Sequence, residues 1–149
     1  MATIQLRREH LEAMIRHARE AAPAECCGLI GGTIKPFEPS DPSASRARTL
    51  YRLRNVTANP ELGYEAAPED LFAAQRQMRE NGEELLAIYH SHPRAADPSP
   101  SETDVRQAYY PSATYLIIGL GGDGPVVRAF SISEREHRWH LVEYEVADE

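Results

Sequence analysis

The sequence predicts a mixed α+β domain in which helices flank a central β-sheet. Short apolar runs bounded by charged or turn-forming residues, such as residues 85–89 and 115–120, have the length and composition of buried strands. Between such runs lie segments whose apolar residues recur at helical spacing, such as residues 11–22. The 149 residues are enough to bury a core, and we expect one domain over residues 1–149.

Strands are predicted where apolar residues cluster or alternate with polar ones. Gly31-Gly32 is predicted to form a turn after the second strand, and the Pro- and Ser-rich residues 35–47 are predicted to form a loop. The glycines of residues 121–125 predict a hairpin turn between the strands on either side. The expected strands span residues 4–6, 26–30, 49–56, 85–90, 115–120, 126–132 and 137–146.

Helices are predicted from helical spacing together with residues that begin or end a helix. Pro23 helps to end the first helix, whereas Pro68 opens the second and Asn81-Gly82 ends it. Ser101 is expected to cap the third helix at its N-terminus. The expected helices span residues 11–22, 68–80 and 102–110.

Charge and composition argue against several classes of function. The formal net charge of −7 at pH 7 argues against a surface for nucleic acid or anionic membranes. There is no signal peptide and no stretch long enough to span a membrane, so we expect a cytoplasmic location. Cys26 and Cys27 are adjacent, which excludes a disulfide framework, and both are expected to pack in a strand. His10 and His17 have no third metal ligand near them and are expected to be solvated.

One stretch has the pattern of a metal site. His90 and His92 lie two residues apart where a predicted strand ends, so both side chains point to the same side of the sheet. Pro93 keeps His92 out of the helical region, which predicts an extended exit from the strand. A helix capped by Ser101 would present Asp104 back toward the histidine pair. Two imidazoles and one carboxylate leave a fourth position for water, which is the pattern of a catalytic zinc site.

The alternative is a surface loop in which these residues meet by chance. A His-x-His pair alone, or a Ser-x-x-Asp cap alone, would be weak evidence. Their conjunction, joined by a short Pro-rich link, favours the metal site. Ser91 points away from the two histidines and is expected to be structural.

The run His-Ser-His-Pro, followed by seven residues, Ser, two residues and Asp, resembles the JAMM motif of the MPN-domain zinc metalloproteases. Glu25, which precedes Cys26-Cys27-Gly28, matches an upstream glutamate segment of the short prokaryotic members. The resemblance implies that Glu25 is the general base and that Ser101, besides capping the helix, donates a hydrogen bond to the oxyanion. It also implies one zinc ion per chain, held by the two histidines and Asp104, and a three-layer-like α/β/α domain similar to the cytidine deaminases.

The resemblance further implies a substrate class. Members of the family cleave amide or isopeptide bonds after the Gly-Gly tail of ubiquitin-fold proteins. This chain lacks the long insertions of the eukaryotic relatives and looks more like the short prokaryotic members. Their implied partners are ubiquitin-like sulfur-carrier proteins, or the adducts of these carriers with cysteine or a small amine. The tail is expected to enter the cleft as an added strand.

Three other interpretations fit parts of the pattern. RadC-like proteins share a similar signature, but they carry a helix-hairpin-helix segment that we do not find, and the acidic charge does not suit DNA. A non-catalytic MPN scaffold is expected to have lost metal ligands, whereas all of them are present here. Zinc nucleoside deaminases require a Pro-Cys-x-x-Cys segment, which does not occur. We therefore expect a metallopeptidase.

Overall fold

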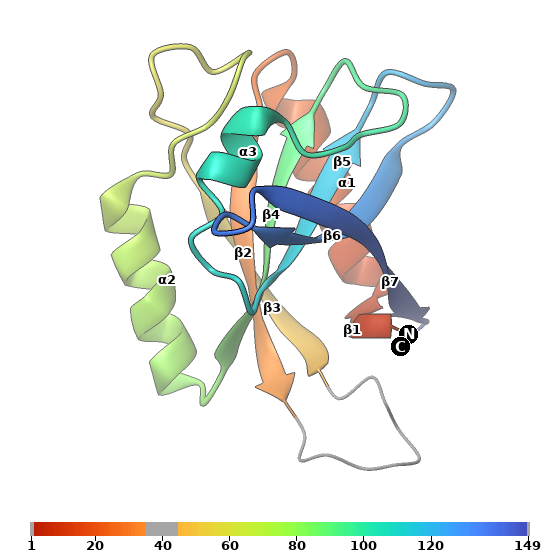
Figure 1. Ribbon diagram of the computed structural model, residues 1–149. Helices are drawn as coiled ribbons and strands as arrows, with labels where there is room; N and C mark the ends of the chain where they lie inside the picture. Colours follow the sequence, from red (N-terminus) through yellow and green to blue (C-terminus); the bar gives the residue numbers. More distant parts are fainter. Residues whose placement is uncertain (1, 35–44, 149) are drawn as a thin grey trace.

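The computed structural model describes residues 2–34 and 45–148, and within them it contains seven strands and three helices (Figure 1). The predicted combination of helices with one sheet is confirmed. No helix of this described part is long and apolar enough to cross a membrane. In chain order the elements are β1 (Ala2–Arg7), α1 (Arg8–Ala21), β2 (Cys27–Ile34), β3 (Ser45–Leu53), α2 (Pro68–Glu80), β4 (Glu84–His92), α3 (Glu102–Arg106), β5 (Thr114–Gly119), β6 (Val126–Ser133) and β7 (Arg138–Ala147).

The seven described strands form one mixed sheet that closes on itself. Its order is β1-β3-β2-β4-β5-β6-β7, and β7 pairs in parallel with β1. The predicted hairpin is confirmed, because β5 and β6 pair antiparallel around residues 121–125. β4 lies between antiparallel β2 and parallel β5, so both of its edges are held by ladder hydrogen bonds. The closure is not apparent from the sequence, because an apolar run does not specify its partner strand.

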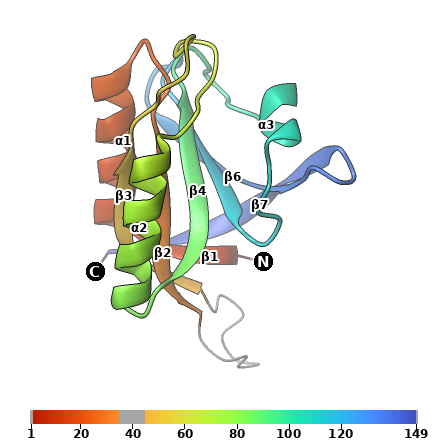
Figure 2. The same cartoon turned by 90° about the vertical axis from the view of Figure 1, so that its left-hand side faces the viewer.

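Helices cover both faces of the strands that lead to the site (Figures 1 and 2). α1 buries Met14 and Ala18 in one apolar core. α2 buries Met78 and α3 buries Val105 in a second core, formed by the alternate side chains of the same strands. This arrangement agrees with the expected layers of helix, sheet and helix, while the likeness to the cytidine deaminases stays a prediction.

The prediction that both histidines of the first helix are solvated is wrong for His10 and holds only in part for His17. His10 is buried, its Nδ1 accepts a hydrogen bond from the backbone N–H of Arg7 (3.1 Å), and its Nε2 lies 3.2 Å from the carbonyl oxygen of Arg48. His17 is half-buried, and its Nδ1 lies 2.7 Å from the Tyr89 hydroxyl oxygen. Helical spacing cannot show this, because the partners Arg48 and Tyr89 come from strands much later in the chain.

The burial of His17 predicts an acid-sensitive contribution to stability. Burial lowers the pKa of His17 from 6.5 to about 4, with the charge of Arg52 adding to the effect and that of Glu20 opposing it. Between about pH 6.5 and 4 the unfolded chain therefore binds more protons, and the folded state loses stability as the pH falls through this window. We expect His17→Gln to reduce this loss by about 1 kcal/mol, allowing for solvent screening of a half-exposed ring.

Urea unfolding at pH 7 and pH 4.5 measures this contribution. His140→Gln, at an exposed position on β7, is the matched control and should lose as much stability on acidification as the wild type. The prediction fails if His17→Gln and His140→Gln lose the same free energy of unfolding between the two pH values.

Gly31-Gly32 lies inside β2 and not in a turn, so that prediction is also wrong. A Cβ on Gly32 would lie 2.1 Å from the carbonyl oxygen of Arg46 on β3, so the close approach of the two strands requires glycine here. The register of β2 with both neighbours shifts at this point, as at a β-bulge. The strand therefore continues to Ile34, and β3 already begins at Ser45, inside the predicted loop. The remainder of that loop lies outside the described residues.

Gly32→Ala is expected to destabilise the fold by about 2 kcal/mol or more, because the added methyl group meets the backbone of a paired strand. The free energy of unfolding in urea measures this. Gly63→Ala is the matched control, since nothing lies within 4 Å of a Cβ at that position. Its effect should stay within about 0.5 kcal/mol. Equal stability of the two variants would contradict the close approach at Gly32.

Two further elements differ from their predicted bounds by four residues at one end. The strand predicted over residues 49–56 is confirmed only in part, because β3 spans Ser45–Leu53. The third helix ends at Arg106 instead of residue 110. Beyond it the backbone N–H of Tyr110 donates to the Tyr115 hydroxyl (3.2 Å), and Ala108 is buried in the core of α2 and α3. These tertiary contacts replace the next turn of helix.

Candidate active site

The histidine pair lies at the end of β4. His90 is fully buried and His92 partly so, and His90 pairs with Cys27 of β2 and Ile117 of β5 in the sheet. The intervening Ser91 is buried on the opposite face, where its Oγ accepts a hydrogen bond from the backbone N–H of Cys26 (2.9 Å). The sheet therefore fixes the two imidazoles on one face, and Ser91 has the structural role that the alternation predicts.

The short helix α3 presents the carboxylate. Ser101 caps it as predicted: its Oγ accepts a hydrogen bond from the backbone N–H of Asp104 (3.0 Å), and its own N–H donates to Asp104 Oδ2 (2.9 Å). The two bonds form a reciprocal capping box. They turn the Asp104 side chain back toward the helix start, where the end of β4 lies.

Three donor atoms meet at this point. His90 Nε2 lies 3.2 Å from His92 Nε2, and Asp104 Oδ2 lies 3.1 Å from each of them. Ligands at the 2.0–2.1 Å typical of zinc, in tetrahedral geometry, are separated by about 3.3 Å. The triangle of donor atoms therefore has the size that a tetrahedral zinc site requires, and its composition of two imidazoles and one carboxylate is a zinc donor set. The structure thus brings together the three residues that the sequence singled out as ligands.

Glu25 lies beside this triangle, just before β2. Its backbone N–H donates to the Pro60 carbonyl (2.7 Å), and its carbonyl accepts from Asn55 Nδ2 (3.0 Å). A carboxylate oxygen of Glu25 and a ring nitrogen of each of His90 and His92 lie within 4.8 Å of one another, a cluster that has the donor atoms to hold a metal ion. Among the described residues, buried Oε1 of Glu25 has no hydrogen-bond partner. An unpartnered buried carboxylate oxygen is costly, which indicates that this atom serves a ligand or a reaction.

The carboxylates of the site differ in protonation. Burial raises the pKa of Glu25 to about 7; the charge of His92 opposes this and that of Asp104 adds to it. Burial also acts to raise the pKa of Asp104, but the hydrogen bonds with His90 and His92 outweigh it and leave the pKa well below its usual range. Burial acts to lower the pKa of His92, but Asp104 outweighs it and the pKa is raised. Near neutral pH Asp104 is thus ionised, whereas Glu25 is poised to gain or lose a proton.

Comparison with known proteins agrees with this geometry. A family model of prokaryotic homologs of the JAB domain matches residues 7–133, a span that includes Glu25 and the stretch from His90 to Asp104. The chain belongs to the prokaryotic JAB family. The resemblance to the JAMM motif is thereby confirmed, and as a member of this family the chain is a JAMM-type hydrolase.

Individual relatives cover most of this JAB chain. It is 34% identical to desampylase from Haloferax volcanii over 115 residues, which are 74% of this chain and 76% of that protein. It is 28% identical to CysO-cysteine peptidase from Mycobacterium tuberculosis over 147 residues, which are 96% of this chain and 82% of that protein. The solution structure of a protein from Desulfitobacterium hafniense matches with a TM-score of 0.82 at 34% identity, covering 98% of this chain and 94% of that one.

The structure adds two residues to the site of this JAB domain that the sequence did not reveal. Asn55 donates to the carbonyls of Glu25 and Gly63 and accepts hydrogen bonds from the backbone N–H groups of Thr57 and Glu65, so it holds the segment after β3 against Glu25. The ring of Tyr64 lies against that of His90, with centroids 4.7 Å apart. The sequence shows only a loop here, because both roles depend on contacts with distant strands.

A cleft of about 460 Å³ opens beside the donor triangle. Its inner wall includes Tyr64, which contacts His90, and Thr103, which precedes Asp104. The exposed Tyr109 also lines it and gives it an apolar rim. The cleft therefore lies next to the candidate metal ligands through Tyr64 and Thr103, and none of the three ligands lines it.

Cys26 and Cys27 pack beside the donor triangle and supply none of its donor atoms, while Cys27 also lines the 460 Å³ cleft. Both are buried and free. Burial raises the pKa of Cys26 to about 11 and that of Cys27 to about 12, so almost no thiolate exists at neutral pH. The prediction that they are packing residues is consistent with this burial.

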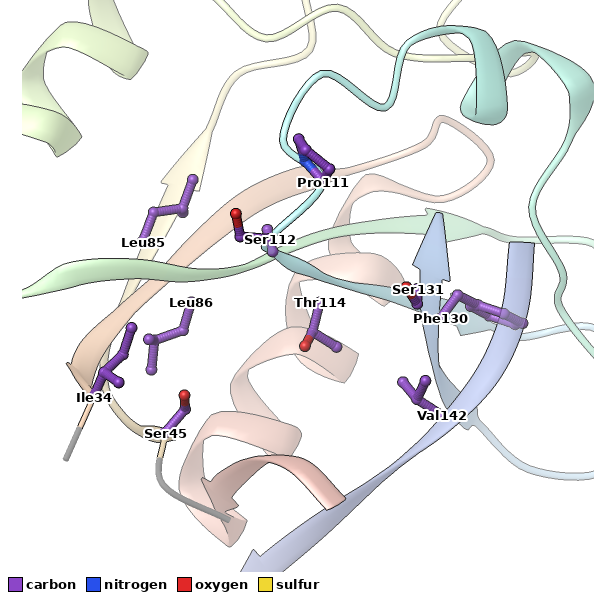
Figure 3. A pocket seen from close by; sticks show the side chains of 11 residues that line it. Ile34, Ser45, Leu85, Leu86, Pro111, Ser112, Thr114, Phe130, Ser131 and Val142 are labelled. Carbon is purple, nitrogen blue, oxygen red and sulfur yellow. The ribbon is translucent and has the colours of Figure 1, made fainter. Parts of the chain in front are cut away.

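A smaller cavity of about 180 Å³ lies at the other end of the strands (Figure 3). Leu85 and Leu86, at the start of β4, line it together with Thr114 and Phe130, and none of its lining side chains is charged. It shares no lining residue with the 460 Å³ cleft. It therefore plays no part in the chemistry at the end of β4.

Proposed function

We propose that this chain is a zinc-dependent peptidase that hydrolyses the amide bond after the Gly-Gly end of a ubiquitin-like protein. The donor triangle of His90, His92 and Asp104, with the unpartnered Glu25 carboxylate beside it, carries the proposal. The names of the relatives, desampylase and CysO-cysteine peptidase, support the substrate class. The proposed partner is a ubiquitin-like sulfur carrier with a Gly-Gly tail, or its adduct with cysteine or another small amine.

Each site residue has a distinct proposed task. One zinc ion held by His90, His92 and Asp104 would polarise the scissile carbonyl and make a nearby water more acidic. Glu25 takes a proton from the attacking water and delivers it to the nitrogen of the departing amine, a role that suits its raised pKa. Ser101 Oγ already accepts the N–H of Asp104, so its hydroxyl proton remains to donate to the oxyanion.

The 460 Å³ cleft is the proposed site of the substrate tail. Each described strand already pairs on both sides, β1 and β3 through the single pair Gln5–Arg46, so we place the tail elsewhere than at an edge of that sheet. It would run instead along residues 63–66, which line the cleft and are held in place by Asn55. The complete donor triangle also disfavours the alternative of a non-catalytic scaffold that has lost its ligands.

The test uses CysO and ubiquitin, each prepared with a C-terminal Gly-Gly followed by one alanine. The zinc-loaded protein is expected to release alanine from at least one of them, leaving a product that ends in Gly-Gly, as measured by intact mass. A chelator should stop the reaction, and added zinc should restore it. Replacing the last glycine by alanine in the substrate should slow cleavage if the cleft selects for Gly-Gly. If the zinc-loaded protein leaves both substrates intact, the proposal is wrong.

A further inference from the structure

Another cavity, of about 320 Å³, borders the proposed catalytic residues. Glu25 and His92 line it, together with the charged residues Glu61 and Arg94. It shares no lining residue with the 460 Å³ cleft. The candidate ligands thus lie between two separate spaces, since His90 contacts Tyr64 of the cleft while His92 lines the 320 Å³ cavity.

The position of Glu25 indicates which part of the substrate this cavity receives. In amide hydrolysis the water proton must finally reach the departing nitrogen, so that nitrogen has to lie within reach of the general acid. Glu25 does not line the 460 Å³ cleft; it lines the 320 Å³ cavity and also a hollow of about 610 Å³, but only the 320 Å³ cavity is lined by both Glu25 and the candidate ligand His92. If the tail occupies the 460 Å³ cleft, the departing amine and its substituents occupy the 320 Å³ cavity. This assignment rests on the proposed function.

Arg94 and Glu61 form an ion pair that lines the 320 Å³ cavity. Arg94 Nη2 lies 3.3 Å from Glu61 Oε1, with 79% of the Arg94 side chain and 50% of the Glu61 side chain exposed. An exposed ion pair of this kind contributes little to stability, so a ligand carboxylate can replace Glu61 as the partner of Arg94 at low cost. A guanidinium is the side chain best suited to bind a carboxylate with two parallel hydrogen bonds.

The backbone around Arg94 is fixed even though its side chain is exposed. The N–H of Ala95 donates to the His92 carbonyl (3.0 Å), and the N–H of Gly121 donates to the Ala95 carbonyl (2.9 Å). A Cβ on Gly121 would lie 2.1 Å from the Arg94 carbonyl oxygen, so the turn after β5 packs directly against this loop. Arg94 therefore projects from a rigid loop that begins at a candidate metal ligand, and its reach relative to Glu25 is set by the fold.

We propose that Arg94 binds a free carboxylate on the departing amine. The preferred substrates are then carriers whose Gly-Gly end is joined to the α-amino group of a single amino acid. In an isopeptide with a protein lysine the α-carboxyl group is part of the peptide chain and lies a long alkyl stem away from the cleaved bond. Arg94 is thus a specificity-determining residue that distinguishes amino-acid adducts from protein conjugates.

The experiment compares two versions of whichever carrier is cleaved above, ending in Gly-Gly-alanine with a free carboxylate or in Gly-Gly-alaninamide. Alanine carries no thiol that could bind the metal. The wild type is expected to cleave the acid with a kcat/KM about tenfold higher than the amide, mostly through KM. In Arg94→Gln this acid-to-amide ratio should fall about tenfold, to near one. Glu61→Gln removes the competing acid and should lower KM for the acid about threefold.

Arg8→Gln is the matched control, because Arg8 also pairs with an exposed acid, Asp148, away from the site. Its acid-to-amide ratio should equal that of the wild type. A wild type that cleaves both versions equally, or an Arg94→Gln variant that keeps the wild-type ratio, overturns the role of Arg94 while leaving the proposed function intact. Absence of cleavage of every version by the zinc-loaded wild type overturns both.

Discussion

Glu25→Gln is expected to lower kcat for cleavage after Gly-Gly about 10²–10⁴-fold while the zinc content stays at the wild-type level. Glutamine keeps the size and the position of the side chain but can neither take a proton from water nor deliver it to the leaving nitrogen. Glu25 is buried beside the donor triangle and its Oε1 has no partner among the described residues, so within that part of the chain the substitution breaks no hydrogen bond of that oxygen. Steady-state kinetics with metal analysis of the same samples measures both effects.

Two comparisons make this result specific. Glu80→Gln, at an exposed position on α2, should retain wild-type kcat. Glu25→Asp retains a carboxylate on a shorter side chain and should fall between the wild type and Glu25→Gln, because catalysis by a base depends steeply on position. A Glu25→Gln protein with kcat within threefold of the wild type would exclude Glu25 as the base. Loss of zinc together with activity would instead make Glu25 a metal ligand, the other role that its place beside the histidines allows.

The parts of the fold that the sequence predicts well are those with local causes. Helix α2 begins at Pro68 and ends at Glu80, next to Asn81-Gly82, and Gly82 has the positive φ of 67° that a glycine accommodates. The errors have causes in tertiary packing. The glycine pair in β2 reflects the close approach of β3, and beyond the end of α3 the backbone N–H of Tyr110 donates to the Tyr115 hydroxyl, five residues along the chain, instead of continuing the helix. Composition and periodicity carry no information on either contact.

Within the site, too, local patterns could be predicted from the sequence and tertiary contacts could not. The relative placement of His90, His92 and Asp104 follows from strand alternation and helix capping over fifteen consecutive positions, so the sequence alone brings them together. Glu25 lies 65 residues before His90 and its place depends on the pairing of β2 with β4, so only the resemblance to a known family suggested it. Asn55 and Arg94 carry no sequence signal, because their partners are set by how loops pack on the finished sheet.

His92→Ala and Asp104→Ala are each expected to remove the bound zinc, from about one ion per chain to below about 0.1, and to abolish cleavage. Each substitution takes one donor atom from the triangle and leaves two. A tetrahedral site with one open position needs three protein ligands, so two are too few. Metal analysis after dialysis against a weak chelator measures the zinc. Thermal unfolding measures the same loss independently: saturating zinc at about 1,000 times its Kd stabilises a folded chain by about 4 kcal/mol, so it should raise the Tm of the wild type but not of either variant.

The loss of zinc affinity should be smaller for substitutions that remove no donor atom of the triangle. Ser101→Ala removes a hydrogen bond that orients Asp104 but no donor atom, so zinc affinity should fall only about 10–100-fold, as for other groups that orient a ligand. His140→Ala, on the exposed face of β7, should bind zinc like the wild type. If Asp104→Ala retained zinc while Ser101→Ala lost it, the carboxylate would not be a ligand and the cap would matter for another reason. If the wild type itself bound no added zinc, the triangle with its 3.1–3.2 Å distances would be a hydrogen-bonded cluster and not a metal site. In such a cluster Asp104 would be ionised and His92 protonated, which the raised pKa of His92 allows.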